Sequence, residues 1–94
     1  MYQATIDLTD CKYLMDLHER IKIGLHLDEG YGRNLDAFWD EINRNIKCNF
    51  ITVKGCKTVS KDLRGTVEIM REILERNKQS WVHSRYPFDY EFID

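Results

Sequence analysis

The chain of 94 residues is long enough for one domain with its own hydrophobic core and too short for two, so we expect a single domain over residues 1–94. Its 43% hydrophobic residues indicate a globular protein, and its net charge of −2 excludes a nucleic-acid binder that relies on bulk positive charge. Its longest apolar runs span a few residues, far below the roughly 18 that a membrane span needs.

The N-terminal segment and the cysteines both favour the cytoplasm. The first ten residues carry no basic segment followed by an apolar one, so we expect no secretory signal. The cysteines are odd in number and form no Cys-x2-Cys pair, and no histidine pair has a zinc-ligand spacing, so we expect free thiols, no metal and no cofactor. These residues are Cys11, Cys48, Cys56, His18, His26 and His83.

The first third of the chain predicts a strand followed by a helix. Residues 2–8 alternate between apolar and polar side chains, which is typical of a strand with one buried face. Thr9 and Asp10 are suitable N-cap residues for a helix that ends at Gly24. The apolar face of this helix comprises Leu14, Leu17 and Ile21.

The next segment predicts a loop and a second helix. Residues 24–33 contain three of the five glycines and indicate a loop. Asn34 is a strong N-cap residue, and apolar side chains follow it at helical spacing. They are Leu35, Phe38, Trp39, Ile42 and Ile46.

The remaining residues predict two strands around a third helix. Residues 49–53 are rich in β-forming side chains, and a turn or helical piece is expected at 60–63. A helix opens at Gly65 and Thr66, and residues 88–92 alternate as a strand suited to a sheet edge. The helix has its apolar face on Val67, Met70, Ile73 and Leu74, and the strand has one face on Phe88, Tyr90 and Phe92.

Strands separated by helices pair in parallel through right-handed crossovers. If the three strands lie in the order 1-2-3, both crossovers place their helices on the same face of the sheet. We therefore predict a two-layer α/β domain with a three-stranded parallel sheet.

The charges are unevenly distributed along the chain. Residues 1–53 hold nine acids against six bases, whereas residues 54–85 hold eight bases against four acids. Between His26 and Asn43 only Arg33 opposes five acids, so one surface should be anionic. These acids are Asp28, Glu29, Asp36, Asp40 and Glu41.

The sequence holds few candidates for catalysis. It lacks a GxSxG nucleophile motif, a phosphate-binding glycine loop and an HExxH zinc motif. A pairing of Cys48 or Cys56 with His83 is one option, but buried structural cysteines are far commoner than catalytic pairs. Asp36 and Asp40 lie one turn apart on one helix, whereas catalytic carboxylates flank a cleft from separate elements. We predict that the protein is not an enzyme.

The acidic helix has two interpretations. It is a solvated face on which Asp40 pairs with Arg44, or it is a binding surface flanked by Tyr31 and Trp39. Aromatic side chains beside charges are typical of protein interfaces.

The segment from Tyr31 to Asp40, YGRNLDAFWD, closely resembles the YGxNLDALWD motif of the barstar family, the intracellular inhibitors of the ribonuclease barnase. Residues 16–18, DLH, resemble the family's first helix. The resemblance covers nearly the whole chain and implies a two-layer α/β domain. It also implies inhibition of a secreted, barnase-like ribonuclease by the second helix and the preceding loop.

Carried over by position, the family's interface includes Tyr31, Asn34, Asp36, Trp39, Asp40 and Asn43, with Glu68 as a further candidate. The resemblance implies that Asp40 takes the place of a substrate phosphate and that the partner is a protein, without direct nucleic-acid or membrane binding. Two residues depart from the family: Gly30 replaces an aromatic side chain, and Arg33 replaces an acid and should weaken electrostatic attraction. The alternative is a module of the same fold that binds a basic partner other than a nuclease.

Overall fold

The computed structural model describes residues 3–45, 48–81 and 88–94, with every side chain in these ranges except those of residues 44, 45 and 81. Its elements are β1 (Gln3–Asp7), α1 (Leu14–Gly24), α2 (Leu35–Asp40), a π-helical segment η1 (Glu41–Asn45), β2 (Phe50–Lys54), two 3-10 turns η2 (Cys56–Thr58) and η3 (Lys61–Leu63), α3 (Arg64–Trp81) and β3 (Asp89–Phe92).

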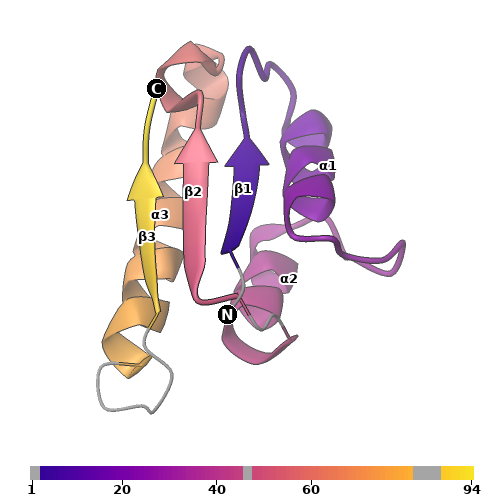
Figure 1. The fold of residues 1–94 in the computed structure, drawn as a ribbon. Helices are drawn as coiled ribbons and strands as arrows, with labels where there is room; N and C mark the ends of the chain where they lie inside the picture. Colours follow the sequence, from indigo (N-terminus) through magenta and orange to yellow (C-terminus); the bar gives the residue numbers. More distant parts are fainter. Residues whose placement is uncertain (1–2, 46–47, 82–87) are drawn as a thin grey trace.

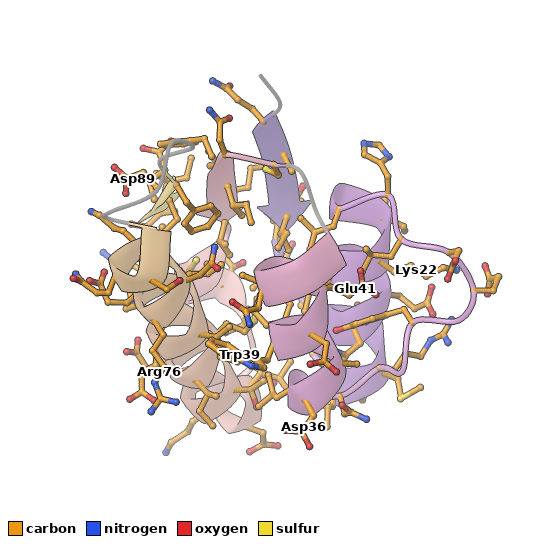
Figure 2. All side chains as sticks on the ribbon, turned by 90° about the horizontal axis from the view of Figure 1, so that it is seen from below. Lys22, Asp36, Trp39, Glu41, Arg76 and Asp89 are labelled. Carbon is orange, nitrogen blue, oxygen red and sulfur yellow. The ribbon has the colours of Figure 1, made fainter. Side chains whose placement is uncertain are left out.

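The three strands form one parallel sheet in the order β1-β2-β3, which confirms the predicted topology. β2 is central, with Ile51 opposite Ala4 on one side and opposite Tyr90 on the other. All three α-helices lie on the same side of the sheet (Figures 1 and 2). The molecule is therefore a two-layer α/β domain, as expected.

The core lies between the sheet and the helices. Alternate residues of β1 and β2 are buried, which for β1 is the two-residue period that its sequence predicted. The predicted face of α3 is buried in full. The residues concerned are Ala4, Ile6, Ile51, Val53, Val67, Met70, Ile73 and Leu74. None of the described helices is long and apolar enough to cross a bilayer.

The predicted N-cap of α1 is wrong. Tyr13, not Thr9 or Asp10, precedes the helix, and its side chain makes no capping hydrogen bond. The Thr9 hydroxyl donates to Asp7 Oδ1 at 2.6 Å, and the Asp10 amide donates to Thr58 Oγ1 at 2.8 Å. These two residues thus form a turn that joins the end of β1 to η2. Leu14, predicted on the buried face, is the first residue of α1 and is 49% exposed.

The second helix changes geometry along its length. Its α-helical part ends at Asp40 and continues as the π-helical segment η1, instead of forming one regular helix. Ile46, the last residue of the predicted apolar face, lies outside the described residues, as does Tyr2 at the start of the first predicted strand.

Gly24 allows α1 to pack closely on β1. A Cβ atom at this position would overlap the carbonyl oxygen of Thr5 and lie 3.1 Å from the Cα of Ile6. Gly24 therefore has a packing role in addition to ending the helix.

We predict that Gly24→Ala destabilises the fold by about 1–3 kcal/mol, because the added methyl group meets backbone atoms of β1 that cannot move aside. Urea denaturation measures the free energy of unfolding. Gly65→Ala is the matched control, since a Cβ there meets nothing within 4 Å. It should leave stability unchanged or raise it by up to about 1 kcal/mol. Equal losses from the two variants would contradict the packing role.

Candidate partner-binding surface

Asn34 fixes the start of α2. Its backbone is extended, and its side-chain Oδ1 accepts a hydrogen bond from the Ala37 amide at 2.7 Å. Its Nδ2 donates to the Gly32 carbonyl at 3.3 Å, which ties the cap to the preceding loop. The predicted N-cap is confirmed, and the helix begins directly where the loop ends.

One face of α2 is buried and the opposite face is exposed. Phe38 and Ile42 lie in the core, while Asp36 and Asp40 are exposed, one turn apart. Trp39 is half-buried at the edge of the core and lies between α2 and α3 (Figure 2). Asn43 is half-buried one turn beyond Asp40. We call the set Asn34, Asp36, Trp39, Asp40 and Asn43 the α2 surface.

Tyr31 is placed differently from the other five predicted interface residues. It is 3% exposed, and its hydroxyl group lies 2.9 Å from Nδ1 of His18, itself buried on α1. Tyr31 therefore packs the loop against α1, and its ring is buried instead of exposed beside the α2 surface. Sequence reasoning missed this pairing because the two residues belong to separate elements.

Burial also sets the protonation of this pair. Removal from water lowers the pKa of His18 and raises that of Tyr31, which the nearby Glu41 carboxylate raises further. Both side chains are therefore neutral at pH 7, and their hydrogen bond joins an uncharged imidazole to an uncharged phenol.

Both acids of α1, and Glu29 of the loop, are paired with cations. Asp16 lies 3.3 Å from Arg20, Glu19 lies 2.6 Å from Arg33, and Glu29 contacts Lys22. Among the described side chains, neither Asp36 nor Asp40 has a cation within ion-pair distance. The Arg44 side chain, the predicted partner of Asp40, lies outside this described set. Among the described side chains, the acids between His26 and Asn43 that lack an ion pair are thus Asp28 in the loop, Asp36 and Asp40 on α2, and Glu41 in η1.

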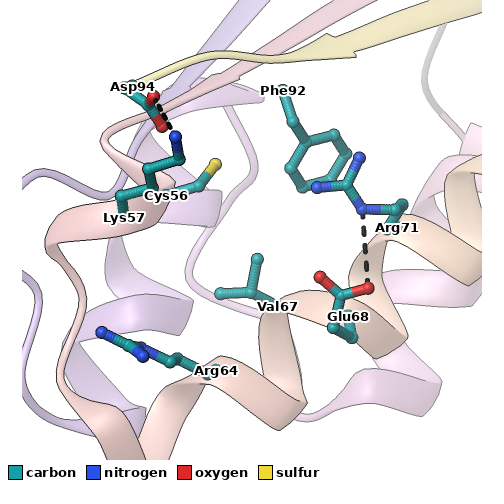
Figure 3. A pocket seen from close by; sticks show the side chains of 8 residues that line it. All are labelled: Cys56, Lys57, Arg64, Val67, Glu68, Arg71, Phe92 and Asp94. Atoms are coloured by element: carbon teal, nitrogen blue, oxygen red, sulfur yellow. Dashed lines mark ion pairs between the residues drawn. The ribbon is translucent and has the colours of Figure 1, made fainter.

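A cavity of about 610 Å³ lies elsewhere, between α3 and the carboxyl ends of β2 and β3 (Figure 3). Its charged side chains are largely paired: Lys57 lies 3.1 Å from Asp94, and Arg71 lies 3.6 Å from Glu68. Glu68, the further interface candidate, lines this cavity and pairs with Arg71 across one turn of α3.

The cavity offers no described catalytic pair. Burial raises the pKa of the Cys56 thiol, and no histidine is among the described residues that line the cavity. His83, the predicted partner of Cys48 or Cys56, lies outside the described residues. Within the part of the chain that the structure describes, no group of three or more metal-ligating side chains is brought together.

Protonation of His18 should weaken the fold below neutral pH. Because burial lowers its pKa, the unfolded chain binds this proton at a higher pH than the folded protein does. The free energy of unfolding should be unaffected by this group above pH 6.5, its ordinary pKa, and should decrease as the pH falls from there. The slope is at most about 1.4 kcal/mol per pH unit. Urea denaturation between about pH 7.5 and 5 measures it.

Two histidine variants test whether His18 causes this pH dependence of the free energy of unfolding. His18→Gln should flatten the dependence between about pH 6.5 and 5.5, whereas His26→Gln, at an exposed position, should retain it. The reverse result would show that the dependence does not come from the buried pair.

One protein family, described as Barstar (barnase inhibitor), has a family model that matches residues 1–93. The match includes the loop, α2 and the whole sheet.

Proposed function

The chain belongs to the barstar family, and from this membership we propose that it inhibits a barnase-like ribonuclease by covering the enzyme's active site with the α2 surface. The partner is a ribonuclease of the secreted type, and the inhibitor acts in the cytoplasm. At the level of the family, the function is that of an inhibitor and not of an enzyme.

The observation that carries the proposal is a pair of exposed carboxylates on α2 that have no cation partner among the described side chains. A ribonuclease must hold a phosphodiester, which it does with cationic and hydrogen-bonding side chains. Asp36 and Asp40 are exposed on a helix whose other face is buried, so their positions are fixed without a bound partner. A carboxylate held in this way accepts several charge-assisted hydrogen bonds and replaces phosphate. We assign this phosphate-mimicking role to Asp40.

The other residues of the α2 surface supply contacts around this carboxylate. Trp39 is half-buried and offers its exposed edge as apolar contact area. Asn34 and Asn43 flank the acids with amide groups able to donate and accept hydrogen bonds. Tyr31 contributes indirectly, because its hydroxyl group holds the loop against His18. An inhibitor of this design needs no catalytic residue and no direct contact with nucleic acid.

We predict that Asp40→Ala remains folded and loses inhibition. Asp40 is exposed, and exposed charges contribute at most about 1 kcal/mol to stability. In the complex its removal leaves desolvated cations of the enzyme unpaired, which costs about 3 kcal/mol or more. The dissociation constant for barnase should rise by at least about a hundredfold. Inhibition of RNA cleavage by barnase measures it, with thermal unfolding as the check on folding.

Asp62→Ala is the matched control. It removes the same charge from an exposed position in η3, at the opposite end of the sheet from α2 (Figure 1). It should change inhibition by less than about threefold, as expected for a rim or distant charge. Equal effects from the two variants, or an unfolded Asp40→Ala protein, would show that Asp40 is an ordinary solvated residue.

We also predict that salt slows association. The screening length falls from about 30 Å at about 0.01 M salt to about 3 Å at about 1 M, so attraction between the acids of α2 and a cationic pocket weakens. The association rate with barnase should fall by at least about tenfold over this range in stopped-flow measurements. A rate that does not depend on salt would contradict attraction through the α2 surface.

Capture of partners from the source organism, followed by mass spectrometry, tests the identity of the target. Recovery of a ribonuclease that the chain inhibits supports the proposal. A specific partner that is basic but has no nuclease activity supports the alternative, a binding module of the same fold.

A further inference from the structure

Arg33 joins three separate parts of the structure at the end of the loop. Its Nε and Nη2 each lie 2.6 Å from Oε1 of Glu19 on α1. Its Nη2 also lies 3.5 Å from Glu29 in the middle of the loop, and its Nη1 donates to the Tyr31 carbonyl at 3.3 Å. One guanidinium group therefore ties the helix, the loop and the backbone before α2.

Lys22 completes this cluster. It hydrogen-bonds to Glu29 and lies 3.9 Å from Oε2 of Glu19. The side chains of Arg33 and Lys22 are only 26% and 14% exposed, whereas that of Glu19 is 40% and that of Glu29 is 84% exposed. The pair of Arg33 with Glu19 is therefore screened less than the largely solvated pairs of Glu29. Two cations balance two carboxylates, and the cluster adds no net charge to the surface. We call Glu19, Lys22, Glu29 and Arg33 the Arg33 latch.

The backbone at Arg33 needs such support. Its φ of 52° lies in the left-handed region, which is unfavourable for residues other than glycine. Surrounding contacts must hold a residue in this conformation. Asn34, which caps α2, comes next in the chain, so the conformation of Arg33 sets the direction in which the chain enters this cap.

We propose that Arg33 is a positioning residue for partner binding, which acts by holding the loop and the first turn of α2 in the bound arrangement before the partner arrives. This inference rests on the proposed function of the α2 surface. Its physical basis is that order present in the free chain does not have to be created on binding. A lysine cannot replace the arginine, because its compact ammonium group has one nitrogen, whereas three separate nitrogens of the planar guanidinium group make these contacts.

The direction in which binding changes when Arg33 is removed distinguishes a positioning role from a purely electrostatic one. If Arg33 were only a cation near an anionic surface, its removal would speed association with a cationic enzyme and tighten binding. The Arg33 latch predicts weaker binding through faster dissociation, although the same positive charge has been removed.

The test compares Arg33→Gln and Arg33→Lys with two controls. Arg64→Gln removes the same charge at an exposed position at the start of α3, and Ile73→Val loosens the core away from the loop. Amide hydrogen exchange of residues 28–34 is measured in the free chain, and dissociation from barnase by surface plasmon resonance. We expect Arg33→Gln to raise both rates by about tenfold. Arg33→Lys should change both in the same direction, and the controls should change neither by more than about twofold.

Several results would overturn the inference. One is unchanged exchange and dissociation in Arg33→Gln, and another is faster association without faster dissociation. A third is an effect of Ile73→Val as large as that of Arg33→Gln, because general destabilisation would then suffice. If Arg33→Gln does not fold, Arg33→Lys, which keeps the charge, decides by the same two measurements. Failure of the unaltered chain to bind barnase would count against the proposed function, whereas unchanged loop exchange would count against the latch.

Discussion

The rotation of α2 and of its continuation η1 about the helix axis is set by two buried side chains, Phe38 of α2 and Ile42 of η1. Burial of each is worth about 1.5–3 kcal/mol. A turn of about 100°, the rotation of one residue, would move them toward water and bring charged side chains toward the core. The same burial that holds the helix on the sheet therefore aims Asp36 and Asp40 outward. The position of every residue on the α2 surface depends on this constraint.

The acids of α1 are paired with cations, whereas Asp36 and Asp40 on α2 have no cation partner among the described side chains. Figure 2 shows Trp39 on the side of α2 that faces α3. Lys22, a residue of α1, lies on the opposite side of α2. On that second side, the cations of the Arg33 latch neutralise Glu19 and Glu29. The net charge of −2 is small, but none of the described side chains offsets the local charge of Asp36 and Asp40 in this way. Local distribution, and not net charge, accounts for an anionic binding surface on a nearly neutral protein.

Periodic patterns in the sequence predicted most of the fold, because burial of an alternating strand or an amphipathic helix is a local property. They also predicted the cap at Asn34, since the capping side chain and the amide it binds are three residues apart. Contacts between distant residues were not predicted. The Asp10 amide meets Thr58, and Tyr31 meets His18, and no local pattern encodes either pairing. The pairing of Arg33 with Glu19 was likewise not predicted, because the two residues lie 14 positions apart in the chain.

The contacts of the loop stabilise the folded chain, whereas the like charges of the α2 surface destabilise it. The contacts of Tyr31 with His18, and of Arg33 with Glu19, order the loop and stabilise the folded chain at the same time. Asp36 and Asp40, in contrast, place like charges one turn apart, which destabilises a helix by about 0.2–0.5 kcal/mol. Cations of a partner that approach the two carboxylates would relieve this repulsion. A surface that is slightly unfavourable alone, held on a support that is favourable alone, is the arrangement expected of a preorganised binding site. The same arrangement separates the residues that hold the shape of the site from those that recognise the partner.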